Sequence, residues 1–243
     1  MQIGIDPTVD YAFKKIFGTE ENKDLLLDFI NSIMEENNKE KVAEIELLNP
    51  YNPKEFQKDK LSIVDIKARD VKGNSFIIEM QIIVNEFYPK RLLFYWSKVY
   101  QKQVKEKEDY DLLKKVTVIT ISKDPLPLET KKYTNQFKLI CVNDRNIVFC
   151  DDLEIYTIEL SKFKQKAKKI IKNLEKWAYF LENGEKIDDK KLPKCLEDEK
   201  MKTAVKELRK ISMKDKEREL YESRRMAIMD ERVRLKSAIK EGI

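Results

Sequence analysis

Residues 63–84 read IVDIKARDVKGNSFIIEMQIIV, with two apolar-rich runs on either side of the turn-like segment DVKGN. Within each run apolar and polar side chains alternate, which is typical of β-strands because successive side chains point to opposite faces. A turn centred on Val71–Gly73 would place Asp65 opposite Glu79. The stretch therefore predicts a β-hairpin that carries two facing carboxylates.

Two facing carboxylates on a hairpin suggest a cation between them. Directly paired Cβ atoms lie roughly 4.5–5.5 Å apart, so the two charges repel each other unless something positive separates them. Carboxylate oxygens are also the ligands that hard divalent cations prefer. The hairpin thus predicts half of a metal site for phosphoryl chemistry. The alternative is a pair of solvated acids on an exposed strand face, and a register shift of one residue would separate them.

The composition restricts the chemistry that this chain can perform. Its 243 residues include 49 Lys and Arg, 44 Asp and Glu, and no histidine, which gives a net charge of +5. Most of these charges can pair with one another, so the small excess is weak evidence for a polyanionic partner. The absence of histidine excludes Ser-His-Asp and Cys-His catalysis and histidine-based zinc sites. An enzyme of this composition must use carboxylates, lysine, tyrosine, amides or a metal-bound water.

Cysteine usage and hydropathy indicate a cytoplasmic protein. The three cysteines, Cys141, Cys150 and Cys195, lack metal-binding spacing, and such a sparse, odd number is typical of reduced thiols. No apolar run is long enough to span a membrane. The N-terminal segment MQIGIDPTVDYAFKK has no long apolar stretch, so we expect neither a secretory signal nor a membrane partner.

The segments around the hairpin predict a mixed α/β fold in residues 1–123. The expected elements follow the order α-α-β-β-β-α-β, and the helix after the hairpin crosses over onto the same sheet. The first helix is capped by Asp6 or Thr8 and stops at Gly18, and a second helix follows at about 22–36. A strand at 42–48 precedes the two hairpin strands. A helix from Pro89 to about Glu106 then leads to a buried strand at 116–122.

Residues beyond the proline-punctuated segment Asp124–Leu128 predict two further regions. Short strands at 139–142, 147–149 and 155–160 would form a β-rich extension, residues 124–162, packed on the core.

Residues 163–243 predict a charged helical C-terminal region. A helical stripe is expected from Phe163 to Leu181. After Pro193 the helical segments carry only sparse apolar anchors: Ala204, Leu208, Ile211, Leu220 and Met229. This tail can pack on the domain, pair with a second copy as a homodimer, or fray.

An ordered set of segments resembles a known family. DPTVDYAFKKIFG (6–18), LSIVDIKARD (61–70), FIIEMQ (76–81), RLLFYWSKVYQKQ (91–103) and EIYTIELSKF followed by WAYFL (154–181) are similar to the recombination-promoting nuclease/transposase family of the PD-(D/E)XK nuclease superfamily. The resemblance covers most of the chain and implies the restriction-endonuclease-like α/β fold. It also implies magnesium- or manganese-dependent DNA cleavage in recombination or in mobile elements.

The resemblance also assigns roles to single residues. Asp65 and Glu79 match the two metal-binding acids, and Asp10 matches an N-terminal helix acid that would add a further ligand. Gln81 stands where most of the superfamily has the active-site lysine, and Gln103 matches a polar position that points back towards the site.

Two positions depart from the superfamily pattern. Val64 replaces the proline before the first acid, and Gln81 replaces the lysine, although the family generally shares the glutamine. The lysine orients the attacking water and offsets developing negative charge, whereas a glutamine can only hydrogen-bond that water. Lys67 lies on the same predicted face as Asp65, so we expect its ammonium to provide the missing charge at the scissile phosphate, with Gln81 orienting the water.

Two functional hypotheses follow. The first is a metal-dependent endodeoxyribonuclease whose basic residues contact the DNA backbone; the candidates are Lys14, Lys15, Lys58, Lys60, Arg69, Lys90 and Arg91. The second is a DNA-binding or protein-interaction module that keeps the fold but cuts poorly.

Several of these residues also have a structural interpretation. Asp10 can favour the start of its helix, Gln103 can be a surface amide, and Lys67 can be a solubilising charge. The aromatic residues between 94 and 100 can belong to the core or to a base-stacking platform.

Overall fold

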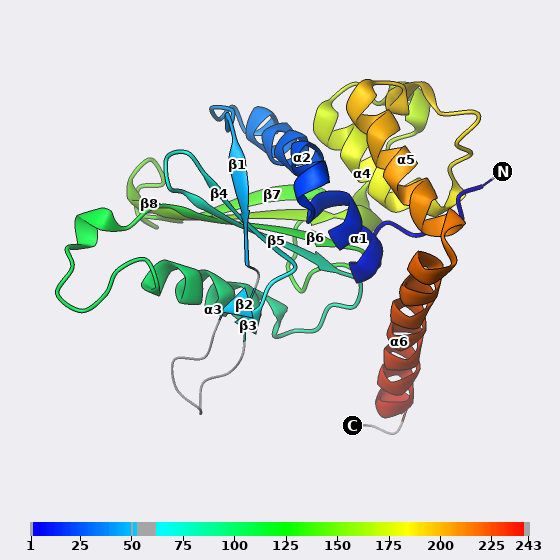
Figure 1. The fold of residues 1–243 in the computed structure, drawn as a ribbon. Helices are drawn as coiled ribbons and strands as arrows, with labels where there is room; N and C mark the ends of the chain where they lie inside the picture. Colours follow the sequence, from blue (N-terminus) through cyan, green and yellow to red (C-terminus); the bar gives the residue numbers. More distant parts are fainter. Residues whose placement is uncertain (1, 50, 53–61, 241–243) are drawn as a thin grey trace.

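A six-stranded mixed sheet flanked by helices forms the body of the protein (Figure 1). The computed structural model describes residues 2–49, 51–52 and 62–240. Across the sheet the strand order is β1-β4-β5-β6-β8-β7, and β2 and β3 form a separate two-stranded ladder. The strands are β1 Ile45–Leu48, β2 Tyr51–Asn52, β3 Ser62–Ile63, β4 Ile66–Asp70, β5 Ser75–Gln81, β6 Val116–Ser122, β7 Thr134–Ile140 and β8 Val148–Glu159. This architecture confirms the predicted mixed α/β fold.

Helices cover both faces of the sheet (Figure 1). Helices α1, α2, α4 and α5 share the larger apolar core with one face, and α3 packs on the opposite face over a smaller core that contains Ile77 and Val118. The helices are α1 Asp10–Phe17, α2 Lys23–Glu36, α3 Tyr88–Gln101, α4 Asn173–Asn183, α5 Glu199–Met213 and α6 Asp215–Lys240.

The β4–β5 hairpin has the predicted register. Ile66 pairs with Ile78 and Arg69 with Ser75, as expected for a turn centred on residues 71–73. Gly73 adopts φ +86°, a left-handed conformation that glycine reaches without a steric penalty. Strand β4 begins at Ile66, so Asp65 lies in a bend at its start and not within the strand.

Strands β5 and β6 form the centre of the sheet. They pair in parallel, with Glu79 opposite Thr120 and Gln81 opposite Ser122, and α3 provides the crossover between them. Both strands are almost completely buried, as expected for parallel strands with helices on both faces. Glu79 and Gln81 therefore lie at the carboxyl end of β5, the edge at which ligands usually bind in open α/β sheets.

The strands beyond residue 124 are longer than the sequence predicts. Three short strands were expected, whereas β7 and β8 form one antiparallel hairpin and β8 continues the sheet in parallel to β6. The apolar pattern misses most of their length because polar side chains, among them Lys138 and Glu154, pair with one another on these strands. The division of the chain into three domains stays an interpretation.

The helix predicted from Phe163 to Leu181 is wrong in its first half. Helix α4 begins only at Asn173, and the preceding segment contains a single three-residue 3-10 turn. A helix there would place Lys164, Lys168 and Lys172 four residues apart on one face, and like charges at that spacing destabilise a helix.

Several helix boundaries also differ from expectation. Neither Asp6 nor Thr8 caps α1: Val9 is the N-cap, and the Asp6 carboxylate instead accepts hydrogen bonds from the Thr8 amide and hydroxyl in the turn before the helix. Helix α3 ends at Gln101 and not near Glu106.

The C-terminal helices pack on the domain through α5 and the first half of α6. Ala204, Leu208 and Ile211 are buried as predicted, whereas Leu220 and Met229 are 45% and 58% exposed. Tyr221 is the buried anchor of α6 instead, and its hydroxyl accepts a hydrogen bond from the Asp6 amide at 2.9 Å. Homodimerisation through these helices stays a prediction.

Every helix in the described ranges is too short or too polar to cross a membrane.

Candidate active site

A pocket of ≈ 280 Å³ lies at the carboxyl end of β5. It is bordered by α1, the bend before β4, the residues after β5, helix α3 and the middle of α6. The predicted site residues that line it are Asp10, Asp65, Glu79, Gln81 and Arg91.

The two predicted metal-binding acids lie side by side across the hairpin. The backbone amide of Asp65 donates a hydrogen bond to Glu79 Oε1 at 3.2 Å. In return, the amide of Met80 donates to Asp65 Oδ2 at 2.9 Å. Each carboxylate is thus held by the backbone of the opposite strand, which fixes both side chains at the pocket.

The positive charges near this pair, Lys14 and Arg91, do not offset the burial of its carboxylates. Glu79 is only 4% exposed. Its burial, followed by the charge of the neighbouring Asp65, raises the pKa of Glu79 to about 8. Burial also raises the pKa of Asp65, although Lys14 and the Met80 amide favour its ionised form. Two adjacent buried acids that resist ionisation are typical of a site completed by a cation or used in catalysis.

Helix α1 brings Lys14 and Asp10 to the edge of the pair. The Lys14 ammonium lies 2.6 Å from Asp10 Oδ1 and 3.2 Å from Asp65 Oδ1. Asp10 and Lys14 are four residues apart, so the two side chains share one face of the helix. In this arrangement Asp10 reaches the acidic pair only through Lys14.

Asp65 and Glu79 fit a magnesium or manganese ion as a two-carboxylate site. Magnesium usually keeps several waters and needs only one or two protein carboxylates. Nowhere in the described ranges do three or more acidic or cysteine side chains come close enough to form a metal-binding group. Asp10, the predicted third ligand, therefore does not join the pair in this structure, because its carboxylate is held by Lys14.

Gln81 and Arg91 also line the pocket and contact each other. Arg91 Nη2 donates to Gln81 Oε1 at 2.5 Å, and Gln81 Nε2 donates to the carbonyl oxygen of Ile83 at 2.6 Å. The guanidinium carbon of Arg91 lies 4.6 Å from the ring centroid of Tyr88 and 5.8 Å from that of Tyr95. The pocket therefore combines two acids, an amide and a guanidinium.

The comparison with known families agrees with this site. A sequence model described as PD-(D/E)XK nuclease family transposase matches residues 7–238 of the 243. The chain belongs to this family. The match confirms the resemblance inferred from the five segments, and the fold described above is the predicted PD-(D/E)XK fold. Neither a curated protein nor a solved structure gives a significant match.

Membership of a PD-(D/E)XK nuclease family carries general chemical consequences. Nucleases of this kind generally depend on divalent metal ions, and their substrate is DNA. In this member the acids of the hairpin are the pair that lies in the pocket, at Asp65 and Glu79.

Three of the predicted site residues lie away from the pocket. Lys67 does not line it; burial and the charges of Arg69 and Lys102 lower the pKa of its ammonium. Arg69 pairs with Glu46 at 3.6 Å. Gln103 donates to the Lys114 carbonyl oxygen and accepts from the Lys114 amide.

The position of Lys67 has a geometric reason. Asp65 lies in the bend at the start of β4, and two residues along a strand advance the chain by roughly 6.6 Å away from the pocket. Lys67 and Asp65 share a strand face, which predicts that Lys67 lies beside the acidic pair. The separation along the strand instead carries Lys67 away from the pair.

Other predicted contacts have mixed outcomes. Lys15 pairs with Glu217 of α6 at 3.2 Å, and Lys58 and Lys60 lie outside the described residues.

Among the aromatic residues of α3, Trp96 stacks on Tyr100 with ring centroids 4.7 Å apart. Both side chains also hydrogen-bond to Asp152, so they pack within the protein.

Sequence reasoning missed the contribution of α6 to the pocket. Ile228 and Glu231 line it, and Arg232 of the same helix lies 3.2 Å from Asp124. The charged tail carries no local signal for this role, because α6 reaches the pocket only through its packing on α1 and α5.

Proposed function

We propose that this protein is a divalent-metal-dependent DNA endonuclease that acts in recombination or in mobile-element transfer, with Asp65 and Glu79 as its metal ligands. The observation that carries this proposal is the adjacent, buried pair of acids at the carboxyl end of β5. The match to a nuclease-transposase family over residues 7–238 supports a magnesium or manganese ion as the further positive charge that this pair would bind.

The protein side chains have distinct roles in this proposal. Glu79, whose pKa is raised to about 8, gives up its proton when the ion binds, and the hairpin backbone keeps both carboxylates in place. Asp65 and Glu79 would hold the ion, which would lower the pKa of a water and polarise the phosphate. Lys14, which contacts Asp65 and Asp10, holds the acidic cluster together before the ion arrives, and Asp10 becomes available as a further ligand when Lys14 moves.

DNA contacts are proposed for the cations nearest to the pocket, Lys14 and Arg91. Arg69 and Gln103 were also predicted to contact DNA; they lie farther along the protein and would meet only a longer duplex. Contacts of this kind to phosphates give affinity that falls steeply with salt and carry little sequence information.

A specific observation favours the alternative function, a DNA-binding or protein-interaction module that cuts poorly. Gln81 occupies the position at which the superfamily has a lysine, and both ends of its amide already make hydrogen bonds inside the protein. A site of this kind would retain DNA without hydrolysing it.

One assay separates the two functions. Supercoiled plasmid is incubated with the protein in Mg²⁺, Mn²⁺ or EDTA, beside Asp65→Asn, Glu79→Gln and the control Glu46→Gln, an exposed acid on β1. We expect nicking in either metal, none in EDTA, none in the two pocket variants and full activity in the control. An intact plasmid in both metals, with DNA still bound in Ca²⁺, would support the module instead.

A further inference from the structure

Among the described residues that line the pocket, one side chain is cationic, and we propose that this residue, Arg91, contacts the scissile phosphate and offsets its developing negative charge, with Gln81 as the residue that positions it. This inference rests on the proposed nuclease function and names the group that performs the electrostatic part of catalysis. Lys67, the residue expected from the sequence to provide this charge, does not line the pocket.

The chemistry requires a cation at this place. Phosphoryl transfer spreads negative charge over the oxygens of the transferred group, and enzymes accelerate it mainly by positioning and by electrostatic stabilisation. Among the residues that line the described pocket, Asp10, Asp65, Glu79 and Glu231 carry carboxylates and Arg91 alone carries positive charge. Nearby Lys14 is already shared between the carboxylates of Asp10 and Asp65.

Gln81 makes a hydrogen bond at each end of its side-chain amide. Its Oε1 accepts from Arg91 Nη2 at 2.5 Å and its Nε2 donates to the Ile83 carbonyl at 2.6 Å. Both ends of the amide are therefore occupied within the protein. The glutamine instead holds the guanidinium on the side of the pocket that faces Glu79, whose ionisation the charge of Arg91 favours.

The guanidinium is aligned and has spare donors. It lies over the rings of Tyr88 and Tyr95, at 4.6 and 5.8 Å, which restricts its plane. Its Nε is buried and makes no hydrogen bond within the described structure. A guanidinium has five N–H donors in a fixed fork that matches phosphate oxygens in pairs, so an anionic ligand can engage the unused ones.

The competing interpretation gives Arg91 a structural role in which it only neutralises the acidic pair. The two roles differ in what the substitution changes. A structural arginine would alter metal affinity and stability along with the rate. A phosphate-binding arginine would alter the rate of the chemical step much more than the metal affinity.

The experiment compares Arg91→Ala, Arg91→Lys, Gln81→Ala and the matched cation control Lys67→Ala with the wild type. Single-turnover cleavage is measured at saturating Mn²⁺ and DNA, and Mn²⁺ affinity is measured separately by calorimetry. We expect Arg91→Ala to lose about 10²–10³ in rate, as for the loss of one transition-state contact. Arg91→Lys should keep more activity, Gln81→Ala should lose about tenfold, and Lys67→Ala should stay within about threefold of wild type.

Two rescue tests report on the missing cation directly. Added methylguanidinium should restore part of the rate of Arg91→Ala, because it can occupy the space between the rings of Tyr88 and Tyr95. The double variant Arg91→Ala/Gln81→Lys should also regain activity, since it returns a positive charge to the same wall of the pocket.

The outcomes are distinguishable. A folded Arg91→Ala protein that cleaves within threefold of wild type would overturn the role of Arg91 while the metal assignment stands. Equal losses in rate and Mn²⁺ affinity, with no rescue, would overturn it in favour of a structural role. If Arg91→Ala does not fold, Arg91→Lys and the double variant decide between these results. Wild-type protein that leaves DNA intact in both metals removes the proposed function, and this inference with it.

Discussion

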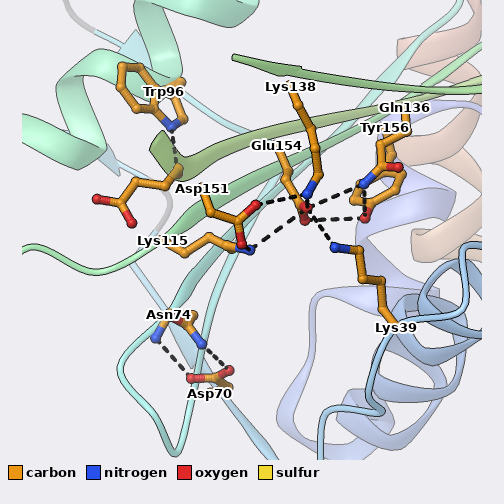
Figure 2. Close-up of polar contacts among 11 residues, drawn as sticks. Lys39, Asp70, Asn74, Trp96, Lys115, Gln136, Lys138, Asp151, Glu154 and Tyr156 are labelled. Atoms are coloured by element: carbon orange, nitrogen blue, oxygen red, sulfur yellow. Dashed lines mark hydrogen bonds and ion pairs between the residues drawn. The ribbon is translucent and has the colours of Figure 1, made fainter. Parts of the chain in front are cut away.

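Two buried glutamates in the same sheet, Glu79 and Glu154, have opposite surroundings. Their exposed fractions are similar, 4% and 3%. Glu79, on β5, faces another carboxylate. Glu154, on β8, lies among the ammonium groups of Lys138, Lys39 and Lys115, at 2.9, 3.3 and 3.7 Å (Figure 2).

The surroundings shift the pKa values of the two acids in opposite directions. Burial opposes ionisation at Glu154, but the hydrogen bond from Lys138 and the charges of the lysines hold its pKa below the ordinary value. At Glu79 burial and the Asp65 charge act together and raise the pKa to about 8. The charge of Glu154 is compensated within the chain, as in a structural ion-pair network. At the Asp65–Glu79 pair the charges of Lys14 and Arg91 do not outweigh burial, and an incompletely compensated pair of this kind is what we propose as a cation-binding site.

The largest difference should appear in DNA cleavage. Glu79→Gln should lower the single-turnover rate by at least about 10²–10³, because a metal ligand and its electrostatic contribution are lost. Glu154→Gln should keep the rate within a few fold at a temperature where it is folded. Quantifying nicked plasmid over time checks this, and equal losses in both variants would remove the distinction between the two acids.

The pH dependence of stability should differ in sign at the two sites. The folded pKa of Glu79 is raised, so without metal its contribution to stability is fully present below the ordinary pKa of 4.5 and is lost as pH rises towards about 8. The steepest slope from one group is about 1.4 kcal/mol per pH unit. The folded pKa of Glu154 is lowered, so its contribution is lost as pH falls below 4.5. Urea unfolding in EDTA at several pH values measures both, and Glu79→Gln should flatten only the decline between pH 5 and 8.

The melting temperature at neutral pH should depend mainly on Glu154. Glu154→Gln leaves three lysines without their shared carboxylate, and breaking a buried ion pair typically costs about 3 kcal/mol or more. For a protein of this size the melting temperature should fall by roughly 6–12 °C. Glu79→Gln replaces an acid that is largely protonated at neutral pH with a neutral side chain of similar shape, so it should leave the metal-free melting temperature unchanged or higher. Calorimetry in EDTA that shows the reverse order would contradict the assignment.

Metal binding should give the smallest of these effects. Mn²⁺ at about one hundred times its dissociation constant should stabilise the wild type by about 2.7 kcal/mol, and Glu154→Gln by the same amount. Glu79→Gln should gain little. Near pH 7 up to about one proton should be released per ion, because Glu79 is protonated before binding. Titration calorimetry in two buffers of different ionisation enthalpy detects this release, which should be absent in Glu79→Gln.

The sequence by itself determined the hairpin and the facing of its acids. Alternation of apolar and polar residues fixes which side chains share a strand face, and the turn around Gly73 fixes the register, so both depend on local chemistry. The buried strand β6 and the crossover through α3 were predictable for a similar reason: a β-branched run and an amphipathic helix carry their signal within a few residues.

Only the tertiary structure decided which charges meet. The contact of Arg91 with Gln81 requires α3 to fold back over β5, and Glu231 reaches the pocket only because α6 packs on α1. The negative charge of Glu154 is likewise compensated only because Lys39, after α2, lies against β8. These residues are far apart in sequence, and the energy of an ionic contact depends on distance and burial. No local pattern could therefore distinguish Glu154, whose charge is compensated by lysines of its own chain, from Glu79, the acid that we propose as a metal ligand.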